Sequence, residues 1–143
     1  MATSNAATTY LEYRLLSYVF KNNAASFSSP GDSIYLGLAT AVSSAEAGSL
    51  TEASYTNYTR KQVTASGWTI SSSSTDTATV TNAANVEWSA SGTDGTSTIT
   101  HVFVADASSS GNILFVGALD ASKAIAEGDI FRINAGNITI ELK

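Results

Sequence analysis

The chain has 143 residues, of which 43% are hydrophobic and 13% charged, and its formal net charge is −5. This length and apolar content suffice for one domain with a buried core, and the acidic balance argues against a surface that binds nucleic-acid phosphates. The lack of cysteine excludes disulfides and cysteine-ligated metal sites, and no apolar run approaches the roughly 20 residues of a membrane span.

The N-terminal region predicts a polar arm followed by a helix. Residues 1–8 are small and polar, without the pattern of a secretory signal. Thr9 and Glu12 have the spacing of a capping box, and Lys21 places a cation near the other end, so we predict a helix over residues 9–23. Its apolar face is broader than one sheet surface needs: it contains Leu11, Leu15, Tyr18 and Val19, widened by Tyr10, Tyr13, Leu16 and Phe20.

Short apolar segments broken by Ser, Thr, Gly and Asn fill residues 33–143. A period of two and turn residues at roughly 8–12-residue spacing predict strands rather than helices. The expected strands are 33–39, 58–63, 68–70, 77–81, 86–89, 99–105, 113–119, 130–133 and 138–142, and residues 41–54 are expected to form a loop. We therefore predict one mainly β domain over residues 1–143, an antiparallel β-sandwich of jelly-roll type preceded by one N-terminal α-helix.

The segment 99–105 is the clearest inner strand. Its alternation predicts Ile99, His101, Phe103 and Ala105 on one face, with the valines between them on the other. The following segment, 113–119, is apolar at both alternating positions, which predicts a central strand.

Few residues in the chain could carry a reaction. His101 is the only histidine, and no acid or serine stands beside it at a suggestive spacing. The carboxylates of the β region fall mostly in turns: Asp94, Asp106, Asp120, Glu127 and Asp129. No phosphate-binding, dinucleotide-binding or calcium-loop motif is present, so we expect no enzyme, no cofactor and no metal, with a small hydrolase based on His101 or paired acids as the remaining catalytic alternative.

Aromatic residues gather in the middle of the chain. Tyr55, Tyr58 and Trp68 are compatible with a carbohydrate or nucleobase platform, and also with a core or subunit interface, where aromatic residues are more common. Arg60 could pair with Glu52 or with Glu87.

A series of different short motifs follows in order from Ser33 onward, over roughly three quarters of the chain. They are Tyr35-Leu36-Gly37-Leu38-Ala39-Thr40, Leu50-Thr51-Glu52-Ala53-Ser54-Tyr55, Tyr58-Thr59-Arg60, Asn85-Val86-Glu87-Trp88, residues 98–106, residues 110–119, Glu127-Gly128-Asp129 and residues 135–140. In this order they resemble a group of small bacteriophage virion proteins that are often labelled tail-fibre-like, some of which serve as head decoration (cement) proteins. Ser110 departs from the double glycine frequent there, and Thr59 from the small residue frequent before the Arg. The resemblance implies a jelly-roll-like sandwich and a place in a virion.

Between the two virion positions, the sequence favours the head. A compact domain with a polar arm and an amphipathic helix suits a trimeric decoration protein that binds the major capsid protein on the capsid surface after assembly in the host cytoplasm. No long repeat or coiled-coil stalk of a fibre is present. The alternative is a tail-fibre, tail-tip or baseplate protein that takes part in host attachment; neither nucleic acid nor a membrane is an expected partner. The predicted interface residues are Tyr10, Leu11, Tyr13, Arg14, Tyr55 and Tyr58.

Overall fold

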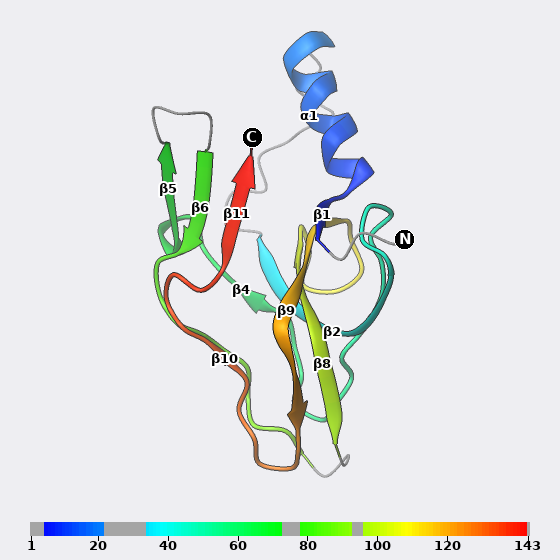
Figure 1. The fold of residues 1–143 in the computed structure, drawn as a ribbon, viewed down its shortest axis with the longest axis vertical. Coiled ribbons are helices and arrows are strands. Elements are labelled where there is room, and N and C mark those ends of the chain that lie inside the picture. The colour runs from blue at the N-terminus through cyan, green and yellow to red at the C-terminus, as the bar shows by residue number, and fades with distance from the viewer. Residues whose placement is uncertain (1–4, 22–33, 73–77, 93–95, 143) are drawn as a thin grey trace.

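The computed structural model describes residues 5–21, 34–72, 78–92 and 96–142. In these residues one α-helix, α1 (Thr9–Lys21), precedes a series of antiparallel strands in curled sheets (Figure 1). The predicted fold class, a mainly β antiparallel sandwich preceded by one N-terminal helix, is confirmed. The described helix is not long and apolar enough to cross a membrane.

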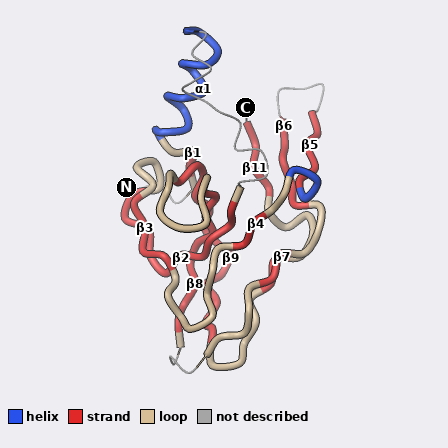
Figure 2. The backbone as a smooth tube through the Cα atoms, turned by 180° about the vertical axis from the view of Figure 1, so that it is seen from behind, coloured by secondary structure: helices blue, strands red, loops and turns tan. Residues whose placement is uncertain are grey.

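The larger sheet has the strand order β1-β9-β8-β2-β3 (Figures 1 and 2). Strand β4 pairs with Tyr35 and Leu36 of β2, the part of β2 that does not pair with β3. The strands of this sheet are β1 (Ala6–Ala7), β2 (Tyr35–Ser44), β3 (Ser49–Glu52), β4 (Lys61–Gln62), β8 (Ser97–Ala105) and β9 (Ile113–Ile125). The two central pairings, β2 with β8 and β8 with β9, join the most apolar segments of the sequence.

The second layer consists of a three-stranded sheet and a strand pair. The order β11-β6-β5 makes the sheet, and β10 pairs with β7. The bounds are β5 (Trp68–Ser72), β6 (Ala78–Asn82), β7 (Val86–Glu87), β10 (Arg132–Ile133) and β11 (Thr139–Leu142), with a 3-10 turn, η2, at Ala65–Gly67. A buried asparagine, Asn82, joins these pieces, because its Nδ2 donates to the carbonyl of Asn134 and its Oδ1 accepts from Ile138 N.

The main hydrophobic core lies between the two layers. Leu36 and Leu38 from the larger sheet and Trp88 from the second layer have no exposed surface. Trp88 packs edge-to-face on Phe131, with the ring centroids 5.6 Å apart. A second cluster forms on the opposite face of the larger sheet, and its members are Ala39, Ala45, Phe103, Ala105 and Val116.

The predicted alternation of the 99–105 strand is wrong at Ile99. The pairing of β8 with β9 shifts register between Ile99 and His101. Ile99 therefore belongs to the main core together with Val104, whereas Phe103 and Ala105 belong to the second cluster.

Two further boundaries differ from the prediction. The expected loop 41–54 is in fact a hairpin, because β2 runs on to Ser44 and β3 follows a turn that ends at Gly48, whose φ is +65°. The expected arm, residues 1–8, contributes β1, which pairs with Val116 and Phe115 of β9. Residues 22–23, the end of the expected helix, lie outside the described residues.

Candidate functional site

The base of α1 is tied to the sandwich. Thr8, 2% exposed, donates from its hydroxyl to the carbonyl of Ile113 (2.6 Å) and from its amide to the carbonyl of Leu114 (2.9 Å). The Thr8 hydroxyl also lies 3.4 Å from the amide nitrogen of Leu11, as an N-cap would. The capping residue is thus Thr8 rather than the predicted Thr9, because the helix begins at Thr9. These bonds fix where the helix starts.

Beyond its first turn, α1 stands clear of the sandwich (Figure 1), and none of its residues is buried. Leu11 packs partly against the main core. On the opposite face of the helix, Tyr13, Leu16 and Phe20 are 66%, 57% and 75% exposed. Their spacing is i, i+3 and i+7, which makes one apolar stripe; we call these three residues the outer stripe of α1.

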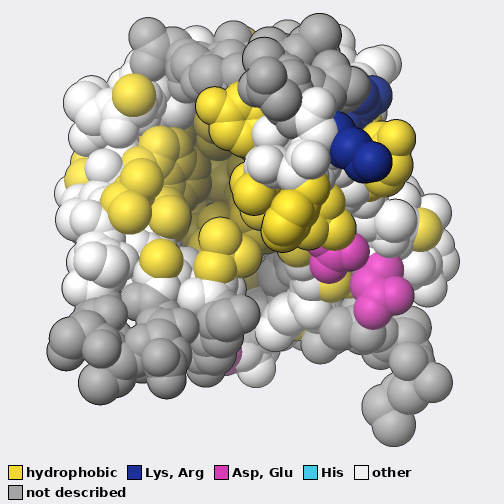
Figure 3. All heavy atoms as spheres, turned by 90° about the horizontal axis from the view of Figure 1, so that it is seen from above, with side chains coloured by type: hydrophobic (Ala, Val, Ile, Leu, Met, Phe, Trp, Pro, Cys, Tyr) yellow, Lys and Arg dark blue, Asp and Glu magenta, His cyan; other side chains and the backbone are white. Residues whose placement is uncertain are grey.

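The same end of the molecule carries further exposed apolar side chains. The sheet of β5, β6 and β11 lies at the end of the molecule where α1 stands (Figure 1), and Ile70 of β5 and Leu142 of β11 are 74% and 54% exposed. Seen from above, hydrophobic side chains surround a hollow at this end (Figure 3). We call α1, Ile70 and Leu142 together the apolar end.

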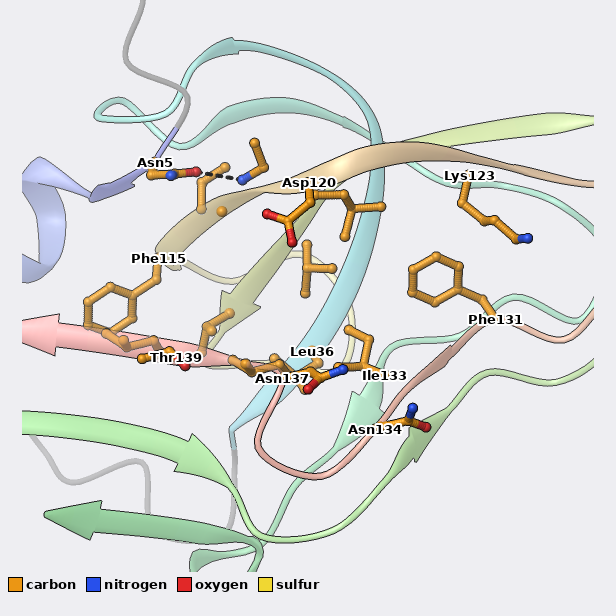
Figure 4. A pocket seen from close by; sticks show the side chains of 18 of the residues that line it. Asn5, Leu36, Phe115, Asp120, Lys123, Phe131, Ile133, Asn134, Asn137 and Thr139 are labelled. Atoms are coloured by element: carbon orange, nitrogen blue, oxygen red, sulfur yellow. Dashed lines mark hydrogen bonds between the residues drawn. The ribbon is translucent and has the colours of Figure 1, made fainter.

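A cleft of about 950 Å³ separates β9 from β11. Val104 and Phe115 line it from the larger sheet, and Ile138, Ile140 and Leu142 line it from the other side. Phe115 and Thr139 lie across from one another in Figure 4. Since Leu142 belongs to both, the cleft reaches the apolar end.

Polar groups stand at the margins of the cleft. Asn5 accepts a hydrogen bond from the amide of Ala118 (2.6 Å), which ties the N-terminal segment to β9 (Figure 4). Asp120 and Lys123 of β9 are exposed at its rim. Within the described ranges, no three His, Asp or Glu side chains are grouped so that they could hold a metal ion.

Arg60 forms the most extensive polar network of the described residues. Its side chain is 5% exposed and forms a bidentate pair with Glu52, with Nε–Oε1 and Nη2–Oε2 both 2.8 Å. Nη1 donates to the carbonyls of Ala107 (2.9 Å) and Ser110 (2.8 Å), and the guanidinium lies 5.0 Å from the centre of the Phe103 ring. Of the two predicted partners, Glu52 is therefore the correct one; Glu87 instead binds Arg132.

The network shifts the pKa values of its members. Burial would raise the pKa of Glu52, but hydrogen bonds from Arg60 and Tyr58, together with the guanidinium charge, outweigh burial and lower it. The Tyr58 hydroxyl donates to Glu52 (2.8 Å) and accepts from the amide of Leu38 (2.9 Å), and burial is the main cause that raises its pKa. Since each of these groups has a partner inside the domain, the network stabilises loops rather than offering a binding site.

Three of the residues considered for catalysis make structural contacts. His101 Nδ1 lies 2.8 Å from the hydroxyl of Thr100, and burial lowers the pKa of the imidazole. Asp106 accepts from the amide and the side-chain nitrogen of Asn112, both at 2.7 Å, and Asp129 accepts from the amide of Ala126 (3.0 Å). These carboxylates stabilise turns; Asp94 lies outside the described residues.

The predicted interface residues separate into two groups. Tyr10 and Tyr13 are exposed on α1, and Leu11 and Arg14 are half-buried on the same helix. Tyr55, in contrast, is 3% exposed and packs edge-to-face on Tyr58, with centroids 5.4 Å apart.

The aromatic platform imagined for Tyr55, Tyr58 and Trp68 is therefore not present on the surface, because Tyr55 is in the core and the other two are half-buried. Conversely, sequence reasoning did not assign a site role to Leu16 or Phe20, although their helical spacing with Tyr13 was already visible. The cleft had no signal in the sequence, since it depends on how β9 and β11 are placed.

A search of curated proteins finds none similar to this chain. A family model, that of the podophage GP4 fiber I protein gp80, matches residues 6–141, which include α1 and the described strands of both layers except Leu142, the last residue of β11. The resemblance to phage virion proteins is confirmed, and the chain belongs to the gp80 fiber I family of structural virion proteins.

Proposed function

We propose that this chain is a structural subunit of a podophage tail fibre and that it takes part in host attachment. The match of residues 6–141 to a family named for a fiber I protein carries the proposal. It favours the tail over capsid decoration, the function that the sequence alone favoured, because the family is named for a fibre and not for a head protein.

The construction of the domain supports a mechanical role. Both faces of the larger sheet are covered by packed clusters, and the Arg60 network holds the 107–110 loop against β3 and β8. Such a domain stays rigid while other molecules pull on it, as a fibre requires. The role needs no reaction, so the proposal assigns the chain no enzymatic activity.

We further propose that the subunit works as a homotrimer. Joining several weak contacts in one assembly raises the overall affinity for a repetitive surface such as a bacterial cell wall by orders of magnitude. The apolar end supplies a surface that can hold subunits together.

Immunogold electron microscopy on intact virions tests the fibre proposal. Antibodies raised against this chain are expected to place gold on the tail fibres. Virions produced without the chain are expected to keep intact heads and to adsorb poorly to host cells. Gold over the head, with purified protein that co-sediments saturably with undecorated capsids, would instead establish decoration through the major capsid protein.

A further inference from the structure

The sandwich leaves most of the apolar surface of α1 exposed. A helix with apolar residues on most of its circumference is normally buried, yet seven large apolar side chains of this helix are exposed: Tyr10, Tyr13, Leu15, Leu16, Tyr18, Val19 and Phe20. A 13-residue helix is also too short to be stable in water by its own hydrogen bonds. The helix therefore needs packing that the described parts of its own chain do not supply.

The exposed apolar area of α1 is comparable to one side of a subunit interface; it is spread over several sides of the helix, and the outer stripe holds about half of it. At about 200 Å² for a fully exposed large side chain, the exposed fractions leave on the order of 700 Å² of α1 side-chain surface uncovered. A standard protein–protein interface takes about 800 Å² from each partner. The helix alone comes close to this value, and Ile70 and Leu142 at the same end add to it.

The outer stripe points to another α1 as the occupant. Tyr13, Leu16 and Phe20 have the i, i+3, i+7 spacing with which helices pack side by side in a seam. The stripe itself carries no charge: Arg14 and Lys21 lie on another side of the helix, and Glu12 stands at the margin of the stripe, one turn before Leu16. Two copies can thus meet along the stripe without like charges in the seam, as symmetric oligomers require of one surface used twice.

We propose that α1 is the self-association element of this protein, in which the outer stripes of α1 from neighbouring copies pack against one another. The proposal names the surface that would join the subunits of the proposed homotrimer, and it holds for a dimer as well. Self-association of purified protein does not depend on where the chain sits in the virion, so its failure and that of the fibre proposal are observed separately.

Light scattering coupled to size-exclusion chromatography tests the proposal on the full chain. The wild type is expected at a multiple of 14.8 kDa, and the double variant Leu16→Glu, Phe20→Glu is expected at 14.8 kDa with unchanged circular dichroism. Ile130→Glu is the matched control and should keep the wild-type mass, because Ile130 is 51% exposed in the segment between β9 and β10. That segment turns at the end of the molecule opposite to α1 (Figure 1). Two results would overturn the proposal. A double variant with the wild-type mass would show that the outer stripe does not join the copies. A monomeric wild type would mean that a different protein covers α1.

A cross-link keeps the test decisive if the double variant fails to fold. The chain contains no cysteine, so Leu16→Cys introduces one thiol near the middle of α1, where equivalent residues meet in either relative orientation of the helices. Mild oxidation is expected to link Leu16→Cys into covalent dimers at low protein concentration, and to leave Ile130→Cys monomeric. Equal cross-linking of the two variants would contradict the proposed contact.

Discussion

Gly37 lies directly beneath the ring of Phe103, its partner across the β2–β8 pairing. A Cβ added at Gly37 would overlap the far edge of that ring. The guanidinium of Arg60 lies over the same ring, 5.0 Å from its centre. The missing side chain of Gly37 thus leaves the space that the Phe103 ring, a contact of the Arg60 network, occupies on the sheet.

Gly37→Ala should therefore destabilise the domain although alanine fits the backbone. The ring must move away from the added methyl group, and overpacking of this kind costs about 1–3 kcal/mol. Chemical denaturation measures the loss. The double variant Gly37→Ala, Phe103→Leu should recover part of it, because the smaller side chain makes room; a double variant whose loss equals the sum of the two single losses would show that the two residues do not interact.

Arg60→Lys should lower the free energy of unfolding by about 3 kcal/mol. The Arg60 side chain is 5% exposed, and one ammonium group cannot replace both its bidentate pair with Glu52 and its two hydrogen bonds to backbone carbonyls. Arg132→Lys is the matched control, because the pair of Arg132 with Glu87 is about half exposed and should contribute less than about 1 kcal/mol. Similar losses for the two variants would mean that burial does not strengthen the Arg60 network.

The sequence predicted the elements with a dense apolar pattern. The strands of 99–105 and 113–119 and the helix after Thr8 have such patterns, and all three are observed. The hairpin of β2 and β3 was missed because the Ala and Ser residues between positions 41 and 49 fit a strand, a turn or a loop about equally well. The same holds for the second half of β9, whose residues 120–124 are all exposed.

The candidate site was predictable only in part, for a related reason. The aromatic residues of α1 could be assigned to an interface because helical spacing shows that one sheet surface cannot cover all of them. Tyr55 and Tyr58 have no such regular pattern, and a tyrosine fits a core or a surface depending on whether its hydroxyl finds a partner. Tyr58 finds Glu52 and the Leu38 amide, contacts that exist only after β2 and β3 have paired.

Acid should weaken the domain through Glu52. Because its pKa is lowered in the folded state, its contribution to stability is present above the unfolded value of about 4.5 and is lost as the pH falls through the folded pKa. Unfolding free energies of the wild type and Glu52→Gln, measured from pH 7 to pH 3, should therefore converge toward the acid end. A difference that stays constant over this range would show that the Glu52 charge does not stabilise the fold.

Titration of His101 should change the stability of the domain in a higher pH range than titration of Glu52. Burial lowers the pKa of His101, so the folded state favours the neutral ring, and the stability gained is lost as the pH falls from the ordinary value near 6.5 through the lowered one. His101→Asn should flatten the pH dependence of unfolding between about pH 7 and pH 5 while leaving the Glu52 effect below pH 5 in place. An unchanged profile above pH 5 would mean that the imidazole titrates alike in both states.

Thr8→Val should loosen the base of α1 and not the sandwich. Valine keeps the shape of threonine in a position that is 2% exposed, but it leaves the carbonyl of Ile113 without the hydroxyl that donates to it at 2.6 Å. The unsatisfied carbonyl and the lost cap should cost about 1–2 kcal/mol. Amide hydrogen exchange can locate the effect: exchange should accelerate in residues 9–21, while the amides of β8 keep their protection relative to global unfolding. If protection falls equally in both, Thr8 holds the whole fold together, and the independence of α1 from the sandwich assumed by the self-association proposal would be lost.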